Sequence, residues 1–367
     1  MFRSLTRLIP TSARAAAAAV AVVAAAAAAT ASMSRAEDDI VEVAIAPVSA
    51  AGRRQQRMYH GKAFPLVVTL PGFTDVAAMK AALAKNKDLL LGMLDTHGAV
   101  LFRGLPLADA PDFMAFLEPF DFEYGDYIGG GGPRTAVLGP IHNSTFTPAD
   151  RHIPFHHELA YLTKYPTKLA FFCQTKPQKN GETPILLSTN LYERIAAERS
   201  AFAAQVVDKG VIYTRVIDSA DASDGKLQRS WQAAYGTDDR AVAEARARDT
   251  GAASIEWLES GAMRVVSHAL PAARRDPRVG ARTWFNAIVL LHPAAQEAGT
   301  QAPWTVTYGD GSPIADDDVL AAKAIMDEER IEFEWREGDV LLVDNMLAMH
   351  ARNPFIGPRL ILAAIAN

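Results

Sequence analysis

Short β-rich segments recur through the second half of the chain, and this pattern restricts the possible folds more than any other feature. Runs rich in Val, Ile, Leu and Phe occur, for example, at 168–175, 210–216 and 339–343, with helical stretches inserted between them. The strand and helix alternation of a parallel sheet is not evident. The pattern therefore predicts a mainly β protein with helical insertions (α+β), built as a double-sheeted barrel or jelly roll.

Composition excludes several classes of protein. The 367 residues are 49% hydrophobic and 22% charged, which is typical of a globular protein with a sizeable core. The formal net charge of -5 argues against nucleic acid as a partner. A single cysteine, Cys173, excludes an intramolecular disulfide framework and a cysteine-based zinc site. Its apolar neighbours predict a buried, inert thiol.

Residues 1–36 differ from the rest of the chain. Arg3, Arg7 and Arg14 come early, no acidic residue precedes Glu37, and alanine dominates 15–31. This composition predicts a removed transit peptide for a mitochondrion or plastid. A secretory signal and a membrane anchor are the alternatives, but alanine is weakly apolar and no stable membrane insertion is expected. Residues 37–367 then form a single catalytic domain.

Periodicity and turn residues predict the remaining elements. A hairpin is expected from 168–175 and 182–187, because a Gly-containing connection joins two β-rich runs. The glycine-rich loop at 129–132 is either a simple turn near a cleft or a mobile lip with Arg134 facing an anionic ligand. Helices are expected at 76–95, 109–117, 191–207 and 319–329, and strands at 66–70, 98–104, 283–291, 331–335 and 360–364.

Three possible metal ligands stand together in Phe155-His156-His157-Glu158. In an extended segment His156 and Glu158 point to one face, and His157 points to the other. A distant histidine, for which His350 is the best candidate, would complete a set of two His and one carboxylate. On iron(II) this set leaves positions open for a co-substrate and oxygen. Catalytic zinc uses similar ligands, so a zinc hydrolase is an alternative, as is an ordinary polar strand.

The motifs, taken in order, resemble the taurine dioxygenase and clavaminate synthase-like superfamily, most closely its clavaminate synthase-like proteins of plants and other eukaryotes. The similarity extends over about residues 45–367. The matching motifs are FHHE at 155–158, PTKLAFFC at 166–173, GETPI at 181–185, WFN at 284–286, YGDGSP at 308–313, GDVLLVDN at 338–345 and HARNPFIGPR at 350–359.

This resemblance implies a double-stranded β-helix (jelly-roll) oxygenase that uses iron(II) and 2-oxoglutarate. His156, Glu158 and His350 match the metal ligands of the family, and Thr183 matches a threonine that contacts 2-oxoglutarate. Arg359 matches the first of two adjacent arginines, one of which anchors the distal carboxylate of 2-oxoglutarate. The second position is Leu360 here, which departs from the family pattern. If the second position is the anchor, affinity for 2-oxoglutarate is reduced here, whereas Arg359 serves instead if the loop after His350 is one residue shorter. Some arginine is needed there, because a buried carboxylate requires a paired cation.

The implied function is a dioxygenase that takes a small-molecule substrate, 2-oxoglutarate and O2, oxidises a C–H bond, and releases succinate and CO2. Hydroxylation is the default outcome, with desaturation and ring closure as alternatives. The carboxylate of Glu158 argues against halogenation, which needs that metal position vacant. A non-catalytic metal-binding jelly roll is a further alternative, which the Leu360 departure keeps open.

Three neighbouring features have two interpretations each. Asp344 and Asn345 either orient His350 or bond the backbone at a strand end. Trp284 and Phe285 are expected in the core or the pocket wall. Arg352 either meets a substrate anion or lies exposed to solvent.

Overall fold

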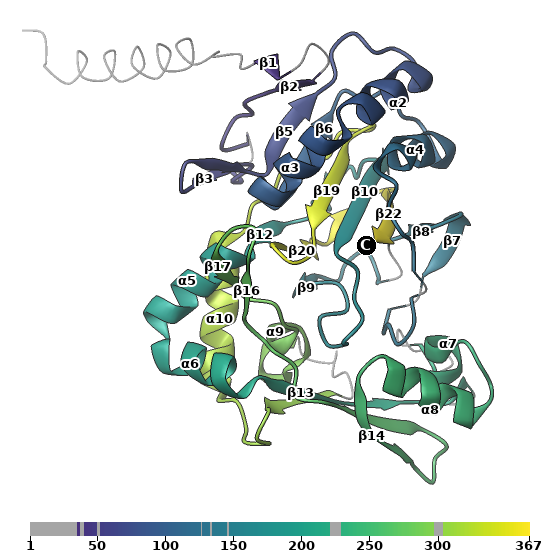
Figure 1. The fold of residues 1–367 in the computed structure, drawn as a ribbon, viewed down its shortest axis with the longest axis vertical. Coiled ribbons are helices and arrows are strands. Elements are labelled where there is room, and N and C mark those ends of the chain that lie inside the picture. The colour runs from purple at the N-terminus through teal and green to yellow at the C-terminus, as the bar shows by residue number, and fades with distance from the viewer. Residues whose placement is uncertain are drawn as a thin grey trace, which may run out of the picture.

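The computed structural model describes residues 35–36, 40–49, 52–125, 127–132, 134–144, 147–220, 229–296 and 304–367. The predicted targeting segment, residues 1–36, lies outside the described residues apart from its last two, so its role remains a prediction. Within the described ranges, no helix is both long and apolar enough to cross a membrane. The fold is rich in sheet with helices packed outside, as the sequence pattern predicts (Figure 1).

A nine-stranded sheet forms the frame of the molecule. Its neighbours are antiparallel except for β5 and β6, which run parallel and are joined through two helices, a βαβ unit that the sequence pattern did not reveal. Central strand β10 is buried on both faces, which explains its continuous apolar sequence. In spatial order the strands are β1 (Arg35–Ala36), β2 (Ile40–Glu42), β5 (Leu66–Thr69), β6 (Ala99–Arg103), β19 (Val340–Asp344), β10 (Lys168–Thr175), β22 (Leu360–Ala366), β8 (Ile141–Asn143) and β7 (Thr135–Leu138).

Two further sheets belong to the frame of the molecule. In the three-stranded sheet, β20 lies between β12 and β9, and its register places His350 opposite both Ile185 and His156. In the four-stranded sheet, β13 alternates buried and half-buried residues along its length. The strands are β12 (Ile185–Leu187), β20 (Ala348–Arg352) and β9 (Ile153–His156), then β14 (Ala252–Trp257), β15 (Met263–Ser267), β13 (Val211–Ile217) and β18 (Trp304–Tyr308).

Three short antiparallel pairs lie outside these sheets. They are β3 (Arg57–Tyr59) with β4 (Lys62–Phe64), β11 (Lys179–Asn180) with β21 (Phe355–Ile356), and β16 (Arg274–Asp276) with β17 (Ala281–Thr283).

The helices gather in three groups around the sheets (Figure 1). Helices α2 and α4 begin where Asp75 and Asp109 accept hydrogen bonds from backbone N–H groups of the first turn. Helix α3 ends at Gly98, whose φ of 75° favours glycine and where a Cβ would lie 3.0 Å from Leu187 Cδ1. The helices are α2 (Val76–Lys85), α3 (Lys87–His97), α4 (Ala110–Leu117), α5 (Ser188–Glu198), α6 (Ser200–Lys209), α7 (Trp231–Tyr235), α8 (Arg240–Asp249), α9 (Ile288–Leu291) and α10 (Asp316–Glu329), with 3-10 turns η1 (Glu118–Phe120) and η3 (Pro293–Ala295).

The core is divided between the two faces of the large sheet. Phe172 of β10 stacks on Phe113 of α4 at a centroid distance of 5.2 Å on one face. Phe171 and Cys173 face the other side, where they join residues of the three-stranded sheet. Burial raises the pKa of Cys173 to about 12, so the prediction of an inert buried thiol is confirmed.

Five predicted elements differ from the structure. The expected hairpin does not form, because β10 pairs with β19 and β22 while β12 pairs with β20 in another sheet. The expected strand at 283–291 is a strand end at β17 followed by helix α9, and the run at 331–335 makes a single bridge. A short apolar run does not reveal by itself whether a helix or a strand buries it. The expected helices at 76–95 and 191–207 are each two helices, α2 with α3 and α5 with α6.

Candidate active site

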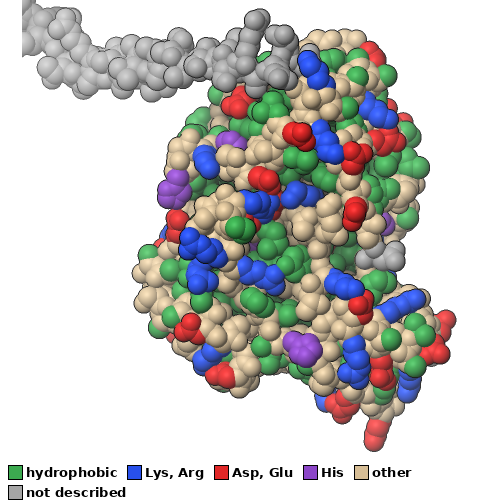
Figure 2. All heavy atoms as spheres, in the orientation of Figure 1, with side chains coloured by type: hydrophobic (Ala, Val, Ile, Leu, Met, Phe, Trp, Pro, Cys, Tyr) green, Lys and Arg blue, Asp and Glu red, His purple; other side chains and the backbone are tan. Residues whose placement is uncertain are grey.

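A cavity of about 390 Å³ lies where the three sheets meet. His156 of β9 and His350 of β20 line it from the three-stranded sheet, and Phe171 of β10 lines it from the large sheet. Arg215 of β13 and Trp304 of β18 close it from the four-stranded sheet. Figure 2 shows basic side chains across the middle of one face, beside a hollow with hydrophobic side chains.

The structure brings together the three residues predicted to bind metal. One ligand atom from each of His156, Glu158 and His350 lies within 4.8 Å of the others. Pairing of β9 with β20 places the two imidazole rings at a centroid distance of 4.1 Å. Glu158 follows two residues after His156, just beyond the strand end, so its carboxylate reaches the same point.

The two imidazoles are suited to metal binding. His156 Nδ1 lies 2.8 Å from the carbonyl of Pro154, and donation there leaves Nε2 as the ring nitrogen with a lone pair. Burial, followed by the charges of His156 and His157, lowers the pKa of His350 well below its usual value. The His350 ring is therefore neutral at neutral pH, and its buried Nδ1 has no hydrogen-bond partner among the described residues.

Glu158 is held as an anion by two neighbours. Tyr127 donates its hydroxyl to Oε1 at 2.9 Å, and Arg134 Nη2 lies 3.0 Å from Oε2. Burial alone would raise the pKa of Glu158, but the Arg134 and His156 charges outweigh it, and the pKa lies below its usual value. Arg134 thus pairs with a carboxylate of the protein itself, whereas the mobile-lip interpretation had it facing an external ligand.

His157 points away from the other two ligand candidates, as the alternation predicts. Its Nδ1 lies 2.5 Å from Asn345 O and its Nε2 lies 2.8 Å from Trp284 O, with the Ser188 hydroxyl 3.0 Å from Nε2. Burial lowers the pKa of His157 to about 4, so the ring is a neutral part of the core. It ties the ligand segment to the turn after β19.

Asn345 acts on the ligand segment rather than on His350. Its side chain bonds the backbone of Glu158 and the carbonyl of Pro166. Asp344 accepts the backbone N–H groups of Met346 and Leu347 and holds the turn. Asp344 and Asn345 therefore bond the backbone near the strand end, and they do not orient His350.

Thr183 and Arg359 meet on the cavity wall. Arg359 Nε donates to Gly181 O at 2.8 Å, and Nη2 lies 3.3 Å from Thr183 Oγ1. Burial and then the Arg352 charge lower the pKa of Arg359 to about 9, so an anionic ligand would stabilise this cation. Leu360, the first residue of β22, packs instead against the core cluster on the opposite face of the sheet.

Arg352 is buried, with 4% of its surface exposed, so the expectation of an exposed side chain was wrong. It donates to the carbonyls of Thr147 and Pro148 at 2.7 Å each, and also to the carbonyl of Arg151. This arginine fastens the segment that leads into β9. Trp284 and Phe285 are fully buried, as expected.

The sequence analysis missed Tyr127 and Arg215. Tyr127 had no recognisable signal, because it precedes the glycine-rich loop without a motif. Arg215 had one: in the alternating strand β13 it falls on the same buried face as Val211, Tyr213 and Ile217. A charged residue on an apolar strand face requires a partner or a function.

Comparison with known proteins identifies the family of the chain. The sequence profile described as taurine catabolism dioxygenase TauD, TfdA family matches residues 69–365. The chain belongs to this family. As a member of the TauD, TfdA family it is an oxidoreductase of the dioxygenase class, with iron(II) as its metal and 2-oxoglutarate as its co-substrate.

Two sequence relatives and one solved structure illustrate the similarity. A clavaminate synthase-like protein of Arabidopsis thaliana is 36% identical over 319 residues, which cover 85% of this chain and 96% of the relative. The dapdiamide synthesis protein DdaC of Enterobacter agglomerans is 29% identical over 286 residues, covering 75% and 84%. The crystal structure of PvcB from Pseudomonas aeruginosa aligns with a TM-score of 0.50 at 15% identity, covering 91% and 94%, and shows similarity of fold.

Proposed function

We propose that this dioxygenase hydroxylates a C–H bond of a small molecule and releases succinate and CO2, with iron(II) held by His156, Glu158 and His350. The convergence of these three ligands in a cavity of about 390 Å³ is the observation that supports the proposal most strongly. Two imidazoles and a carboxylate are the donor set of non-haem iron(II) oxygenases.

Thr183 and Arg359 fit the role of a binding site for the distal carboxylate of 2-oxoglutarate. A half-buried guanidinium beside a hydroxyl offers charge and a second hydrogen-bond donor or acceptor. Both residues line the same cavity as the three metal-ligand candidates. Because Leu360 faces away from the cavity, its departure from the family pattern does not remove this anchor.

The proposed reaction oxidises the substrate and 2-oxoglutarate together with one molecule of O2. Substrate R–H, 2-oxoglutarate and O2 give R–OH, succinate and CO2, with one oxygen atom entering each organic product. The bound iron(II) supplies the activation of dioxygen. The protein orients both organic molecules and excludes water with the apolar side chains of Leu169, Phe171 and Ile361 on the wall.

The proposal extends to the architecture and to the first residues. The large sheet and the three-stranded sheet share one apolar core cluster, which supports the jelly-roll assignment. Residues 37–367 would act as a single catalytic domain, and residues 1–36 would direct the chain to a mitochondrion or plastid before removal.

The test is turnover of 2-oxoglutarate by the purified full chain. With iron(II) and air, the wild-type protein should produce succinate and consume O2 even without substrate, and His350→Ala should reduce this rate at least about 100-fold. The exposed His268→Ala serves as the control and should keep the wild-type rate. Tight zinc binding without 2-oxoglutarate consumption would favour the zinc hydrolase instead.

A further inference from the structure

Arg215 is a buried cation without an acidic partner among the described residues. It has 4% of its surface exposed, and β-strand pairing places it opposite Trp304, with the guanidinium 5.2 Å from a ring centroid of that residue. Its Nη1 donates to Gly129 O at 3.2 Å. A buried charge of this kind is costly unless a counter-charge binds to it.

The two remaining nitrogens of Arg215 are unsatisfied. Both Nε and Nη2 are buried and have no hydrogen-bond partner in the part of the chain that the structure describes. These two nitrogens form one edge of the guanidinium, from which two N–H bonds point in parallel. That edge matches the two oxygens of a carboxylate.

Gly131 shows where an anion would lie. A Cβ atom built on Gly131 would be 3.5 Å from Arg215 Nη2 and 3.7 Å from the Tyr161 hydroxyl. The Tyr161 oxygen accepts the Gly131 N–H at 3.0 Å, which leaves its own proton free for a ligand. All three residues line the large cavity, so two donors converge on a small space at its wall.

The other cations of the cavity have different roles. Arg134 is neutralised by Glu158, the one acidic residue among the described residues that line the cavity. Arg359 lies with Thr183 beside the start of β22, in a different sheet from Arg215. Arg352 also lines the cavity, but it donates to the carbonyls of the segment that leads into β9. Glu158 and the distal carboxylate of 2-oxoglutarate would compensate the charges of Arg134 and Arg359. The charge of Arg215 is then left without an anion.

We propose that Arg215 and Tyr161 bind a carboxylate of the substrate, which makes this protein an oxygenase of small carboxylic acids with an apolar body. The inference rests on the proposed function, since it assigns the substrate class of the same cavity. Leu290, Phe171 and Trp304 provide the apolar wall for the remainder of the molecule. The carboxylate at Arg215 fixes one end of the substrate and orients its C–H bonds.

One competing partner for Arg215 is water. A void of about 30 Å³ on the side of Tyr213 and Ser267 also borders Arg215 and is large enough for one water molecule. A water there would satisfy a nitrogen without creating affinity for a carboxylate. A variant that fills the space at Gly131 separates the two cases, because Gly131 does not line this void.

The experiment compares binding of 3-phenylpropanoate and its uncharged amide to the full chain, loaded anaerobically with iron(II) and saturating 2-oxoglutarate, by calorimetry. The acid should bind at least about tenfold more tightly than the amide. Arg215→Gln should abolish this preference. Gly131→Ala should weaken acid binding about tenfold without strain, since its Cβ makes only ordinary contacts.

Gly132→Ala is the matched control. Its Cβ would meet no atom within 4 Å, so acid binding should stay at the wild-type value. The proposal is overturned if neither probe binds, if acid and amide bind equally, or if Gly131→Ala leaves acid binding unchanged. Because Gly131→Ala keeps Arg215 intact, the test does not depend on the folding of the Arg215 variant.

The same samples distinguish this inference from the proposed function. The visible absorption band of 2-oxoglutarate chelated to iron(II) reports the function independently of the probe. A band without a preference for the acid would overturn the substrate assignment alone. A preference for the acid without a band would leave the anion site standing and remove the oxygenase function.

Discussion

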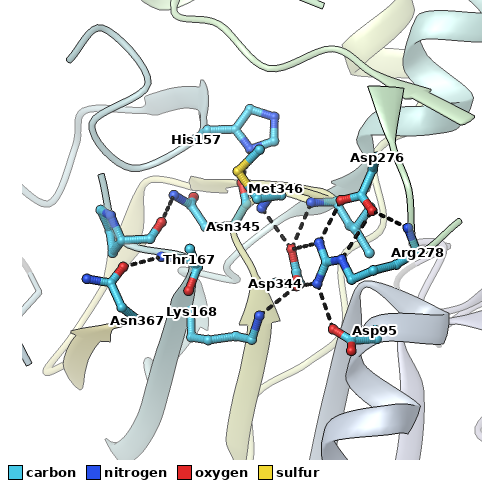
Figure 3. A network of polar contacts seen from close by, with 12 residues as sticks. Asp95, His157, Thr167, Lys168, Asp276, Arg278, Asp344, Asn345, Met346 and Asn367 are labelled. Carbon is cyan, nitrogen blue, oxygen red and sulfur yellow. Dashed lines mark hydrogen bonds and ion pairs between the residues drawn. The ribbon is translucent and has the colours of Figure 1, made fainter. Parts of the chain in front are cut away.

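Asn345 binds both backbone polar groups of Glu158 with one side chain. Its Oδ1 accepts the Glu158 N–H at 2.8 Å and its Nδ2 donates to the Glu158 carbonyl at 3.0 Å, although the residues are 187 positions apart. Its Nδ2 also donates to Pro166 O at 2.7 Å. Figure 3 shows Asn345 beside His157, in the turn that follows Asp344. The carboxylate of Glu158 is thus positioned through its backbone.

Asn345→Asp should weaken iron(II) binding about 10- to 100-fold, a range typical for groups that orient metal ligands. The substitution keeps the size of the side chain but replaces the amide donor by an acceptor that faces two carbonyls. Anaerobic titration with iron(II) measures the affinity directly.

The control for this variant is Asn286→Asp. Asn286 is also buried, donates to Ala272 O and accepts the Ile288 N–H, but touches no metal-ligand candidate. It should lose stability without losing iron(II) affinity. If both variants lose the same iron(II) affinity, Asn345 stabilises the fold but does not specifically position Glu158.

Asp344 is the buried centre of an ionic network that supports the same turn (Figure 3). It is fully buried, lies 2.9 Å from Lys168 Nζ and 2.6 Å from Arg278 Nη1, and accepts two backbone N–H groups. Asp344→Asn should lower the free energy of unfolding by about 2–3 kcal/mol, because Lys168 loses its counter-charge and Arg278 loses one of its three carboxylate partners. Urea unfolding measures the loss.

The exposed Asp95 gives the matched comparison. It also pairs with Arg278, at 2.6 Å, but 42% of its side chain is exposed. Asp95→Asn should change stability by less than about 1 kcal/mol, since solvent screens such pairs. A loss as large as that of Asp344→Asn would contradict the burial argument.

Arg359 and Leu360 have opposite orientations, so their substitutions should separate co-substrate binding from stability. Arg359→Gln should raise the KM for 2-oxoglutarate about 100-fold, because it removes the cation beside Thr183. Leu360→Ala should leave this KM unchanged and lower stability by about 1–3 kcal/mol, because the side chain is only partly buried. Succinate formation at varied 2-oxoglutarate measures both constants.

The exchange of the two residues provides a sharper check. The double variant Arg359→Leu with Leu360→Arg should not recover 2-oxoglutarate binding, since position 360 faces the core on the other side of the sheet. Recovery of a wild-type KM would show that the anchor belongs to the second position after all.

Asp339 should make stability depend on pH. Burial raises its pKa to about 6, against the opposing effect of Arg103 at 3.3 Å. The folded protein holds the Asp339 proton more tightly than the unfolded chain, so this stabilisation is complete below about pH 4 and is lost as the pH rises through 6. The difference between the two pKa values amounts to about 3 kcal/mol.

Asp339→Asn removes this titration. The free energy of unfolding of the variant, relative to wild type, should increase by about 2–3 kcal/mol from pH 4 to pH 7. Urea unfolding across that range measures it, with the exposed Glu259→Gln as the control. If the difference in free energy of unfolding between variant and wild type stays constant or falls as the pH rises, the raised pKa of Asp339 is contradicted.

The sequence was sufficient to predict the residues that face the metal and the co-substrate, but not the residues that hold them in position. Alternation in an extended segment placed His156 and Glu158 on one face, and family motifs pointed to His350, Thr183 and Arg359. The contacts of Asn345 and the ion pair of Arg134 depend on segments far apart in the chain, which local periodicity does not reveal. The hairpin prediction failed for the same reason, since strand partners are chosen by the whole core.

The central claim is that this cavity binds iron(II) and 2-oxoglutarate together. The most direct measurement is the visible absorption spectrum of the full chain after anaerobic addition of both. We predict a weak charge-transfer band that is lost in His156→Ala and weakened in Arg359→Gln. Iron(II) bound tightly at this site without any band on addition of 2-oxoglutarate would contradict the account.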